Sequence, residues 1–228
     1  MPHPRGDFLG KVGAVFGLVG IVLVAASFVG PWWTLSVSVS VVGINVDADA
    51  DFGLFGATSH TTTLAGSSTA TVNYSDNPNI GSVFRLAMIF MVLGAGFGGL
   101  MIALSALSGA RPNLRKFSAL MGVLAFVLAL LGPLYVMTAL PAAVNQESGG
   151  GTTTGFAIDG FFGSESVSLF GNTVAISYAG GWGWYLALVG AIVLLVGAVA
   201  SLRATKVAPA GAPMYAPPLG YYPPPPSP

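Results

Sequence analysis

Four long apolar runs constrain the fold of this chain more than any other feature. An α-helix needs about 20 mostly apolar residues to cross the hydrocarbon core of a bilayer. The runs that meet this requirement are 8–29, 83–108, 117–140 and 184–202. Because 54% of the residues are hydrophobic and only 7% are charged, the composition excludes a soluble globular domain. The sequence predicts a membrane α-helical protein with a bundle of four transmembrane helices.

Charged residues are divided between the two sides of these predicted spans. Seven of the eight basic residues share one side: Arg5, Lys11, Arg111, Arg115, Lys116, Arg203 and Lys206. By the positive-inside rule this side is cytoplasmic. We therefore expect a multi-pass protein of the cell membrane, with the N-terminus 1–7, the turn 109–116 and the C-terminal tail 203–228 in the cytoplasm. The loops 30–82 and 141–183 hold seven of the eight acidic residues and are predicted to be extracellular.

The first outer loop alternates apolar and polar residues, which is typical of half-buried strands. Residues 35–41 alternate Leu or Val with Ser, and residues 44–51 alternate apolar residues with Asn or Asp. Gly43 between them indicates either a second strand or a bulged continuation of the first. Residues 61–74 are rich in Thr, Ser and Val and predict one or two further strands.

The second outer loop has the pattern of a β-hairpin. Residues 166–170 and 173–178 flank Gly171-Asn172, a pair suited to a tight turn, and Val174, Ile176 and Tyr178 would share one face. The chain has no cysteine, and neither loop alone buries enough surface for a stable core. We expect both loops to build one small antiparallel sheet, with its apolar face against the bundle and its polar face in solvent.

The two ends of the chain leave alternatives open. Basic residues before an apolar stretch that ends in small residues also fit a cleaved signal peptide. We expect a retained span, because the apolar run continues to Trp32 and Trp33. From Ala208 the tail is rich in Pro, Ala, Gly and Tyr, a composition that predicts a disordered segment or a Pro-rich docking ligand.

Asp47, Asp49 and Asp51 form the sharpest local motif. Carboxylates at alternate positions supply oxygen ligands to Ca²⁺ in EF-hands, but here Phe52 occupies the position of the turn glycine and Thr58 that of the closing Glu. Alternate side chains on a regular strand also lie about 6.6–6.8 Å apart, too far to share one ion. The leading interpretation is a solvated strand face. The alternatives are a divalent-cation site in a bent segment, a charge filter and a partner-facing patch.

The tryptophans and Arg85 are the expected interaction residues. All four tryptophans, which are Trp32, Trp33, Trp182 and Trp184, lie at the outer ends of the first and fourth spans, as expected of an interfacial belt. Arg85 at the outer end of the second span is interpreted as an anchor to the sheet or as a snorkelling side chain.

Small residues recur at four-residue intervals in the first two spans. The pairs Gly13-xxx-Gly17 and Gly94-xxx-Gly98 allow helix backbones to approach closely in a membrane. We expect them to pack inside this bundle, with homo-oligomerisation as the alternative.

Chemistry-bearing motifs are missing from the sequence. No ionisable residue lies deep within a predicted span, where ion pumps and proton-coupled transporters need one. Phosphate-binding loops, zinc motifs, nucleophile elbows and basic nucleic-acid-binding patches are also absent. The prediction is a non-enzyme without a cofactor, apart from the Ca²⁺ alternative, and its partners are the lipid bilayer and a second copy or another membrane protein.

The order of these features resembles that of the claudin-like group, which includes peripheral-myelin-protein-type and calcium-channel gamma-subunit relatives. In that group a Trp follows the first span, a Gly-Leu-Trp lies in the first outer loop and an Arg starts the second span. Trp33, Gly53-Leu54-Phe55 and Arg85 occupy similar places here. Phe55 replaces the Trp and the cysteine pair of the loop is lacking, which, with the Pro-Tyr tail, indicates a prokaryotic or archaeal relative. The resemblance implies a left-handed four-helix bundle capped by a small antiparallel sheet.

Two functions follow as hypotheses. The first is a non-enzymatic tetraspan protein whose outer sheet makes contacts in adhesion, envelope organisation or membrane-complex assembly, because open sheet edges are templates for association. The second is an accessory subunit or pore element for ion or solute permeation, in which Asp47, Asp49 and Asp51 attract cations at an outer vestibule.

Overall fold

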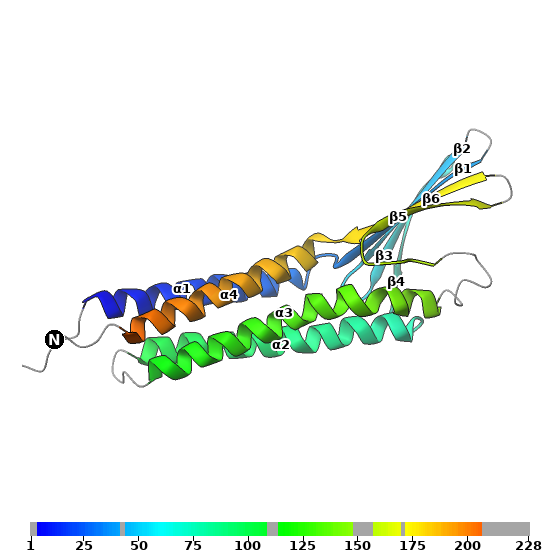
Figure 1. Cartoon of the computed structure of the whole chain (residues 1–228). Helices are drawn as coiled ribbons and strands as arrows, with labels where there is room; N and C mark the ends of the chain where they lie inside the picture. The colour runs from blue at the N-terminus through cyan, green and yellow to red at the C-terminus, as the bar shows by residue number, and fades with distance from the viewer. Residues whose placement is uncertain (1–3, 42–43, 109–113, 148–156, 170–171, 207–228) are drawn as a thin grey trace, which may run out of the picture.

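Four long helices and one six-stranded antiparallel sheet make up the described part of the chain (Figure 1). The computed structural model describes residues 4–41, 44–108, 114–147, 157–169 and 172–206. Each helix contains a segment long and apolar enough to cross a membrane, which confirms the predicted class of multi-pass membrane protein. The helices are α1 (Pro4–Ser27), α2 (Pro78–Leu107), α3 (Leu114–Glu147) and α4 (Trp182–Lys206). The strands are β1 (Trp33–Val41), β2 (Ile44–Phe52), β3 (Ala57–Thr63), β4 (Gly66–Val72), β5 (Gly163–Leu169) and β6 (Asn172–Gly180).

Glycines bring the helices together in two close pairs, α1 with α4 and α2 with α3. A Cβ atom placed on Gly13 of α1 would lie 3.0 Å from the carbonyl oxygen of Gly197 on α4. A Cβ atom on Gly94 of α2 would lie 2.8 Å from the backbone nitrogen of Ala129 on α3. Both distances leave no room for a side chain. The predicted use of the small residues for packing inside the bundle is confirmed at these contacts.

Helices α2 and α3 extend past the predicted spans at their sheet ends. Helix α2 begins at Pro78, because proline suits the first turn of a helix, where its missing N–H is not needed. Helix α3 continues to Glu147, whose Oε1 accepts a 2.7 Å hydrogen bond from the backbone N–H of Asn79 at the start of α2. The apolar pattern marks only the membrane segment, so it missed these added turns.

Strands from the two loops 30–82 and 141–183 form a single sheet, as predicted. Its order is β4-β3-β2-β1-β6-β5, and every neighbouring pair is antiparallel. The pairing of β1 with β6 joins the two loops, since Leu35 lies opposite Tyr178 and Val37 opposite Ile176. Strand β2 is a separate strand that returns along β1, which decides between the two predicted alternatives. Residues 42–43 and 170–171, where two predicted turns fall, lie outside the described residues.

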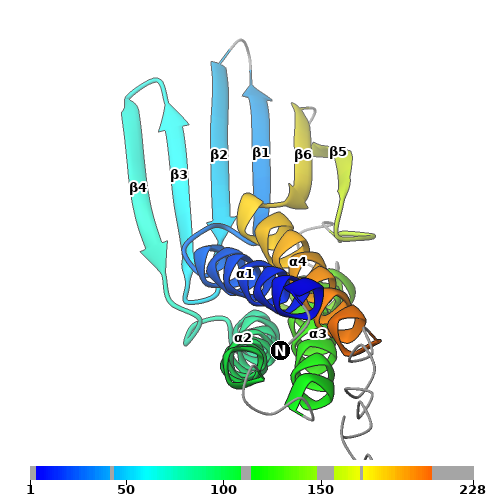
Figure 2. The same ribbon diagram turned by 90° about the vertical axis from the view of Figure 1, so that its left-hand side faces the viewer.

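The apolar face of the sheet turns toward the outer ends of α2 and α3. Val174, Ile176 and Tyr178 share this face and are buried, as predicted. Figure 2 shows the strands extending from the end of the bundle on the side of α1 and α4, away from α2 and α3. On the α3 side, the Asn145 side chain makes two hydrogen bonds to the backbone of Ile158, at 2.9 and 3.0 Å, and ties the second loop to the bundle.

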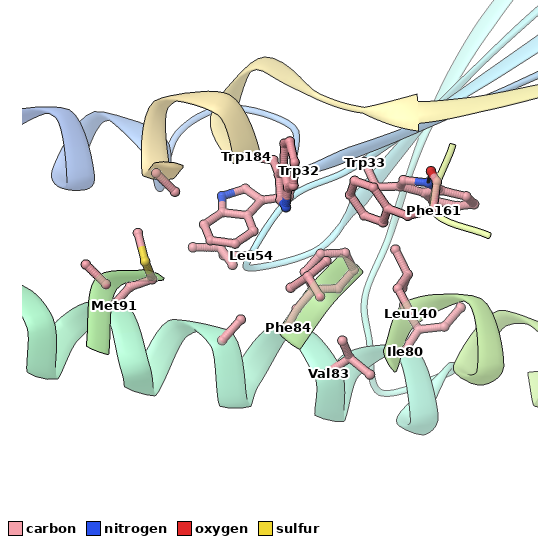
Figure 3. Close-up of a cluster of buried hydrophobic side chains, with 14 of the residues drawn as sticks. Trp32, Trp33, Leu54, Ile80, Val83, Phe84, Met91, Leu140, Phe161 and Trp184 are labelled. Atoms are coloured by element: carbon pink, nitrogen blue, oxygen red, sulfur yellow. Dashed lines mark hydrogen bonds between the residues drawn. The ribbon is translucent and has the colours of Figure 1, made fainter. Parts of the chain in front are cut away.

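Three tryptophans lie in the core at the junction of sheet and helices (Figure 3). Each indole N–H donates to a backbone carbonyl: Trp32 to Ser27 at 2.8 Å, Trp33 to Phe161 at 3.0 Å, and Trp184 to Pro133 at 2.9 Å. Only Trp182 is exposed, at 52%. The predicted interfacial belt is therefore wrong for Trp32, Trp33 and Trp184. An indole at this depth can face lipid or the core, and position along the chain does not distinguish the two.

Charges separate along the length of the molecule. Lys11, Arg115, Lys116 and Arg203 lie near the helix ends remote from the sheet, whereas the aspartates of β2 lie at the sheet end (Figure 1). Both ends of the described chain, in α1 and α4, lie at the basic end. This arrangement agrees with the division of charges on which the predicted orientation rests.

Candidate functional site

One face of the sheet is covered by hydroxyl and carboxylate side chains, and we call it the hydroxyl face. Because successive strand residues point to opposite faces, the register of the five strand pairs shows which residues share it. One row across the sheet runs Ser164, Ser177, Ser36, Asp49, His60 and Thr69. The next row runs Ser166, Ala175, Ser38, Asp47, Thr62 and Ser67. No Lys or Arg occurs in any of the six strands.

Some of these side chains bond to one another across the strands. Ser38 Oγ donates a 2.7 Å hydrogen bond to Asp47 Oδ1, and His60 Nδ1 lies 3.0 Å from Thr69 Oγ1. A hollow of about 300 Å³ lies over β1, β6 and β5 and is lined mainly by serines, among them Ser36, Ser166 and Ser177. The hydroxyl face thus offers donors from Ser and Thr and acceptors from Asp, which suits binding by hydrogen bonds.

Asp47, Asp49 and Asp51 stand on this face at alternate positions of a regular strand. Each lies opposite a hydroxyl residue of β1, and the ladder with β1 continues without a break from Trp33 to Val41. The divalent-cation alternative required a bend here, and the ladder has none. Among the described residues, no group of three or more His, Cys, Asp or Glu side chains is placed to hold a metal ion.

Arg85 lies on the second turn of α2 with an exposed side chain. In the part of the chain that the structure describes, it makes no hydrogen bond or ion pair with the sheet. Its geometry agrees with the snorkelling alternative more than with the anchor. The contact between α2 and the sheet is made instead by Tyr74, whose ring stacks on Phe84 with centroids 5.3 Å apart. The Tyr74 hydroxyl donates to the carbonyl oxygen of Gly53 at 2.5 Å.

A buried tyrosine and a glutamate connect β6 with β5 on the apolar face. The Tyr178 hydroxyl donates a 2.9 Å hydrogen bond to Glu165 Oε1. Burial, together with this hydrogen bond, raises the pKa of Tyr178 above its ordinary value. Glu165 is the acid of edge strand β5, and its engagement with Tyr178 fixes that strand to its neighbour.

The other edge strand, β4, is open. Its sequence GSSTATV contains no charge and no proline, and residues 66–71 are all exposed. Among the described strands it pairs only with β3, so the backbone groups on its other side have no partner in that part of the chain. Natural sheets usually protect such edges with charge, proline or a bulge. The absence of these devices from β4 makes it a site where another strand can add.

A crevice at the base of the hydroxyl face was not foreseen from the sequence. It has a volume of about 320 Å³ and lies between the end of α1 and strands β2 and β3. Asp51, Thr58 and His60 supply its polar wall, while Phe28, Val29 and Phe55 supply apolar side chains. The run Gly53-Leu54-Phe55-Gly56 was the available signal, because glycines on both sides of an apolar pair are typical of a turn with closely approaching backbone.

Comparison of the chain with protein-family models and with curated proteins finds no match to either.

Proposed function

We propose that this protein is a non-enzymatic, multi-pass protein of the cell membrane that acts by contact through its sheet. In this proposal the basic end faces the cytoplasm and the sheet lies outside the cell, as the positive-inside rule implies for the separation of charges. The observation that carries the proposal is the hydroxyl face: a whole side of the sheet is polar and stays outside the core, while on the other side Val174, Ile176 and Tyr178 are buried near the bundle.

The open edge of β4 favours a protein partner that adds a strand. Strand addition supplies main-chain hydrogen bonds from the edge, and alternate side chains then give specificity. Edge strand β5 is less suited, because it carries the charged residue Glu165. The proposed partner is another membrane protein or a second copy of this chain, bound along β4 with contacts to the hydroxyl face.

The packing of the helix bundle favours a role in binding a partner over conduction of ions or solutes through the bundle of a single copy. Its interior is filled by fully buried side chains, among them Val24, Met91, Met101 and Leu194. Permeation therefore requires a pore formed between copies or with a partner. The resemblance to the claudin-like group stays a prediction, and it favours the same role through contacts.

Site-specific crosslinking tests the proposal, because the natural chain contains no cysteine. A Ser68→Cys variant places one thiol on β4, and Lys116→Cys places one at the opposite end of the molecule as a control. In isolated native membranes treated with a short bifunctional maleimide, we expect Ser68→Cys to give a discrete protein adduct that Lys116→Cys does not give.

A pair of edge variants distinguishes strand addition from chance proximity. Substituting lysine for Ser67 and Thr71 places charges on edge strand β4, which should prevent another strand from pairing with it. Substituting lysine for Ser164 and Ser166 makes the same change on edge strand β5. In the Ser68→Cys background, we expect the β4 lysines to abolish the adduct and the β5 lysines to leave it. Equal adduct yields in both variants, or no adduct from Ser68→Cys, would overturn the proposed contact.

A further inference from the structure

The crevice between α1 and the hydroxyl face lies where the first membrane span ends. The apolar segment of α1 ends at Ser27, and the next residues, Phe28 to Pro31, form one wall of the crevice. Asp51, Thr58 and His60 form the facing wall from β2 and β3. A molecule in this crevice would therefore sit at the level where acyl chains give way to headgroups.

An apolar stripe on α1 leads into the crevice. Val15, Leu18, Val22 and Ala25 share one exposed face of the helix, because they follow one another at intervals of three or four positions. Val29, two residues beyond the end of α1, continues the stripe. Val29 is 85% exposed at the crevice, and Phe55 beside it is 68% exposed. The Phe28 and Phe55 rings lie 6.3 Å apart and join this stripe to the sheet. The stripe is long enough for an acyl chain to follow.

The polar wall determines which headgroup fits. It offers a carboxylate, a hydroxyl and an imidazole, and none of the described residues that line the crevice is Lys or Arg, so a phosphate would find no basic partner among them. The hydroxyl face continues away from the crevice with further Ser and Thr residues. Such donors and acceptors match the many hydroxyl groups of a sugar, which can donate hydrogen bonds to a carboxylate.

The geometry points to a lipid-binding site in this crevice, specific for an uncharged glycolipid. The acyl chains lie along the stripe of α1 and against Phe55, and the sugar headgroup bonds to Asp51, Thr58 and the free side of the His60 ring. His60 Nδ1 is engaged by Thr69, so Nε2 is the nitrogen available to the sugar. The site requires α1 to end at a bilayer surface, and it does not depend on a protein partner at β4.

A matched pair of double variants tests this site. Asp51→Asn with Thr58→Val removes the carboxylate charge and the hydroxyl of the polar wall, while Asp47→Asn with Thr62→Val makes the same changes at another Asp-Thr cross-strand pair of the same two strands. Each full-length protein is placed in nanodiscs of phosphatidylcholine with a monoglucosyl diacylglycerol. Native mass spectrometry after release then measures how much glycolipid the protein retains.

The natural chain is expected to retain the glycolipid in preference to phosphatidylcholine. Loss of the Thr58 hydroxyl and of the charge on Asp51 should lower this retention about tenfold in the crevice variant and leave the control variant unchanged. Phe55→Ser should also lower retention of the glycolipid, because it removes an apolar contact to the acyl chains. Phe55 is exposed, so this variant is expected to fold and replaces the double variant if that one does not fold. Circular dichroism checks folding of each variant.

Three outcomes would overturn the site. Equal retention by the natural chain and both crevice variants would show that the crevice does not bind the lipid. Preference for phosphatidylglycerol would show that the headgroup is anionic. Displacement of the glycolipid by soluble methyl glucoside would show that only the sugar is bound. None of these results bears on crosslinking at Ser68, so failure here is separate from failure of the proposed contact.

Discussion

At the scale of single residues, the junction between sheet and bundle depends on buried aromatic side chains with satisfied polar groups. Trp33 packs on Phe52 and Tyr178, with ring centroids 5.1 and 6.1 Å away, and donates to the Phe161 carbonyl. An indole is suited to this place because its large apolar body fills the junction and its N–H meets a carbonyl that would otherwise be buried without a partner.

Replacing Trp33 by Phe should destabilise the protein by about 2 kcal/mol, because the change removes buried volume and leaves the Phe161 carbonyl unpaired. Thermal unfolding in detergent, followed by circular dichroism, measures the loss. Trp182→Phe is the control, since half of the Trp182 side chain is exposed. Equal effects of the two substitutions would mean that Trp33 does not hold the junction.

Tyr74 gives the junction a dependence on alkaline pH. Burial raises the pKa of Tyr74 far above its ordinary value. The phenol stays protonated in the folded protein, whereas in the unfolded chain it ionises above about pH 10. Stability from this group is therefore complete below about pH 10 and falls as the pH rises further.

We expect the midpoint of thermal unfolding to drop between about pH 9 and pH 11 in the natural protein, and to drop less in Tyr74→Phe. The same scan of Tyr178→Phe measures the contribution of the second tyrosine with a raised pKa. A natural protein and a Tyr74→Phe variant with parallel pH profiles would contradict the assignment.

At the scale of elements, close helix packing depends on where each glycine points. Gly94 faces α3, with Ala129 too near for a Cβ atom, whereas a Cβ atom on Gly96 would meet nothing within 4 Å. Both glycines lie in α2, so the comparison separates packing from helix propensity.

Gly94→Ala should therefore destabilise the bundle by about 1–3 kcal/mol, and Gly96→Ala should be neutral or slightly stabilising because alanine favours a helix. The fraction of protein that elutes as a folded species after heating in detergent reports the difference. Similar losses from both variants would show that α2 and α3 are not in the contact described.

The elements also show what sequence patterns can predict. Hydropathy placed the four helices, and the alternation in residues 35–51 and 173–178 placed three strands, β1, β2 and β6, with the correct buried side on β6. The prediction missed the sheet-side ends of α2 and α3, because it placed helices by the length of the apolar membrane run. Ile80 and Val144 lie beyond that run and pack in the core near the sheet. The sequence pattern also did not show whether a side chain at the helix ends faces the core. Trp184 and Trp182 are two positions apart, yet Trp184 is buried and Trp182 is exposed.

At the scale of the whole molecule, the candidate site comes from contacts that no local pattern contains. The three aspartates of β2 could be read directly, but their neighbours on β3 and β4 depend on the register of the sheet. The crevice needs the end of α1 to meet the base of β2 and β3. The sequence therefore predicted a polar surface, and the fold located its open edge and its hollows.

The central claim is a membrane bundle that holds the sheet outside the cell, and thiol accessibility tests it most directly. Single cysteines at Ser68 in β4 and at Ser227 in the C-terminal tail are treated in intact cells with a maleimide that does not cross membranes. We predict labelling of Ser68→Cys on intact cells, and labelling of Ser227→Cys only after the cells are permeabilised. Labelling of Ser227→Cys on intact cells, with Ser68→Cys protected until permeabilisation, would contradict the claim.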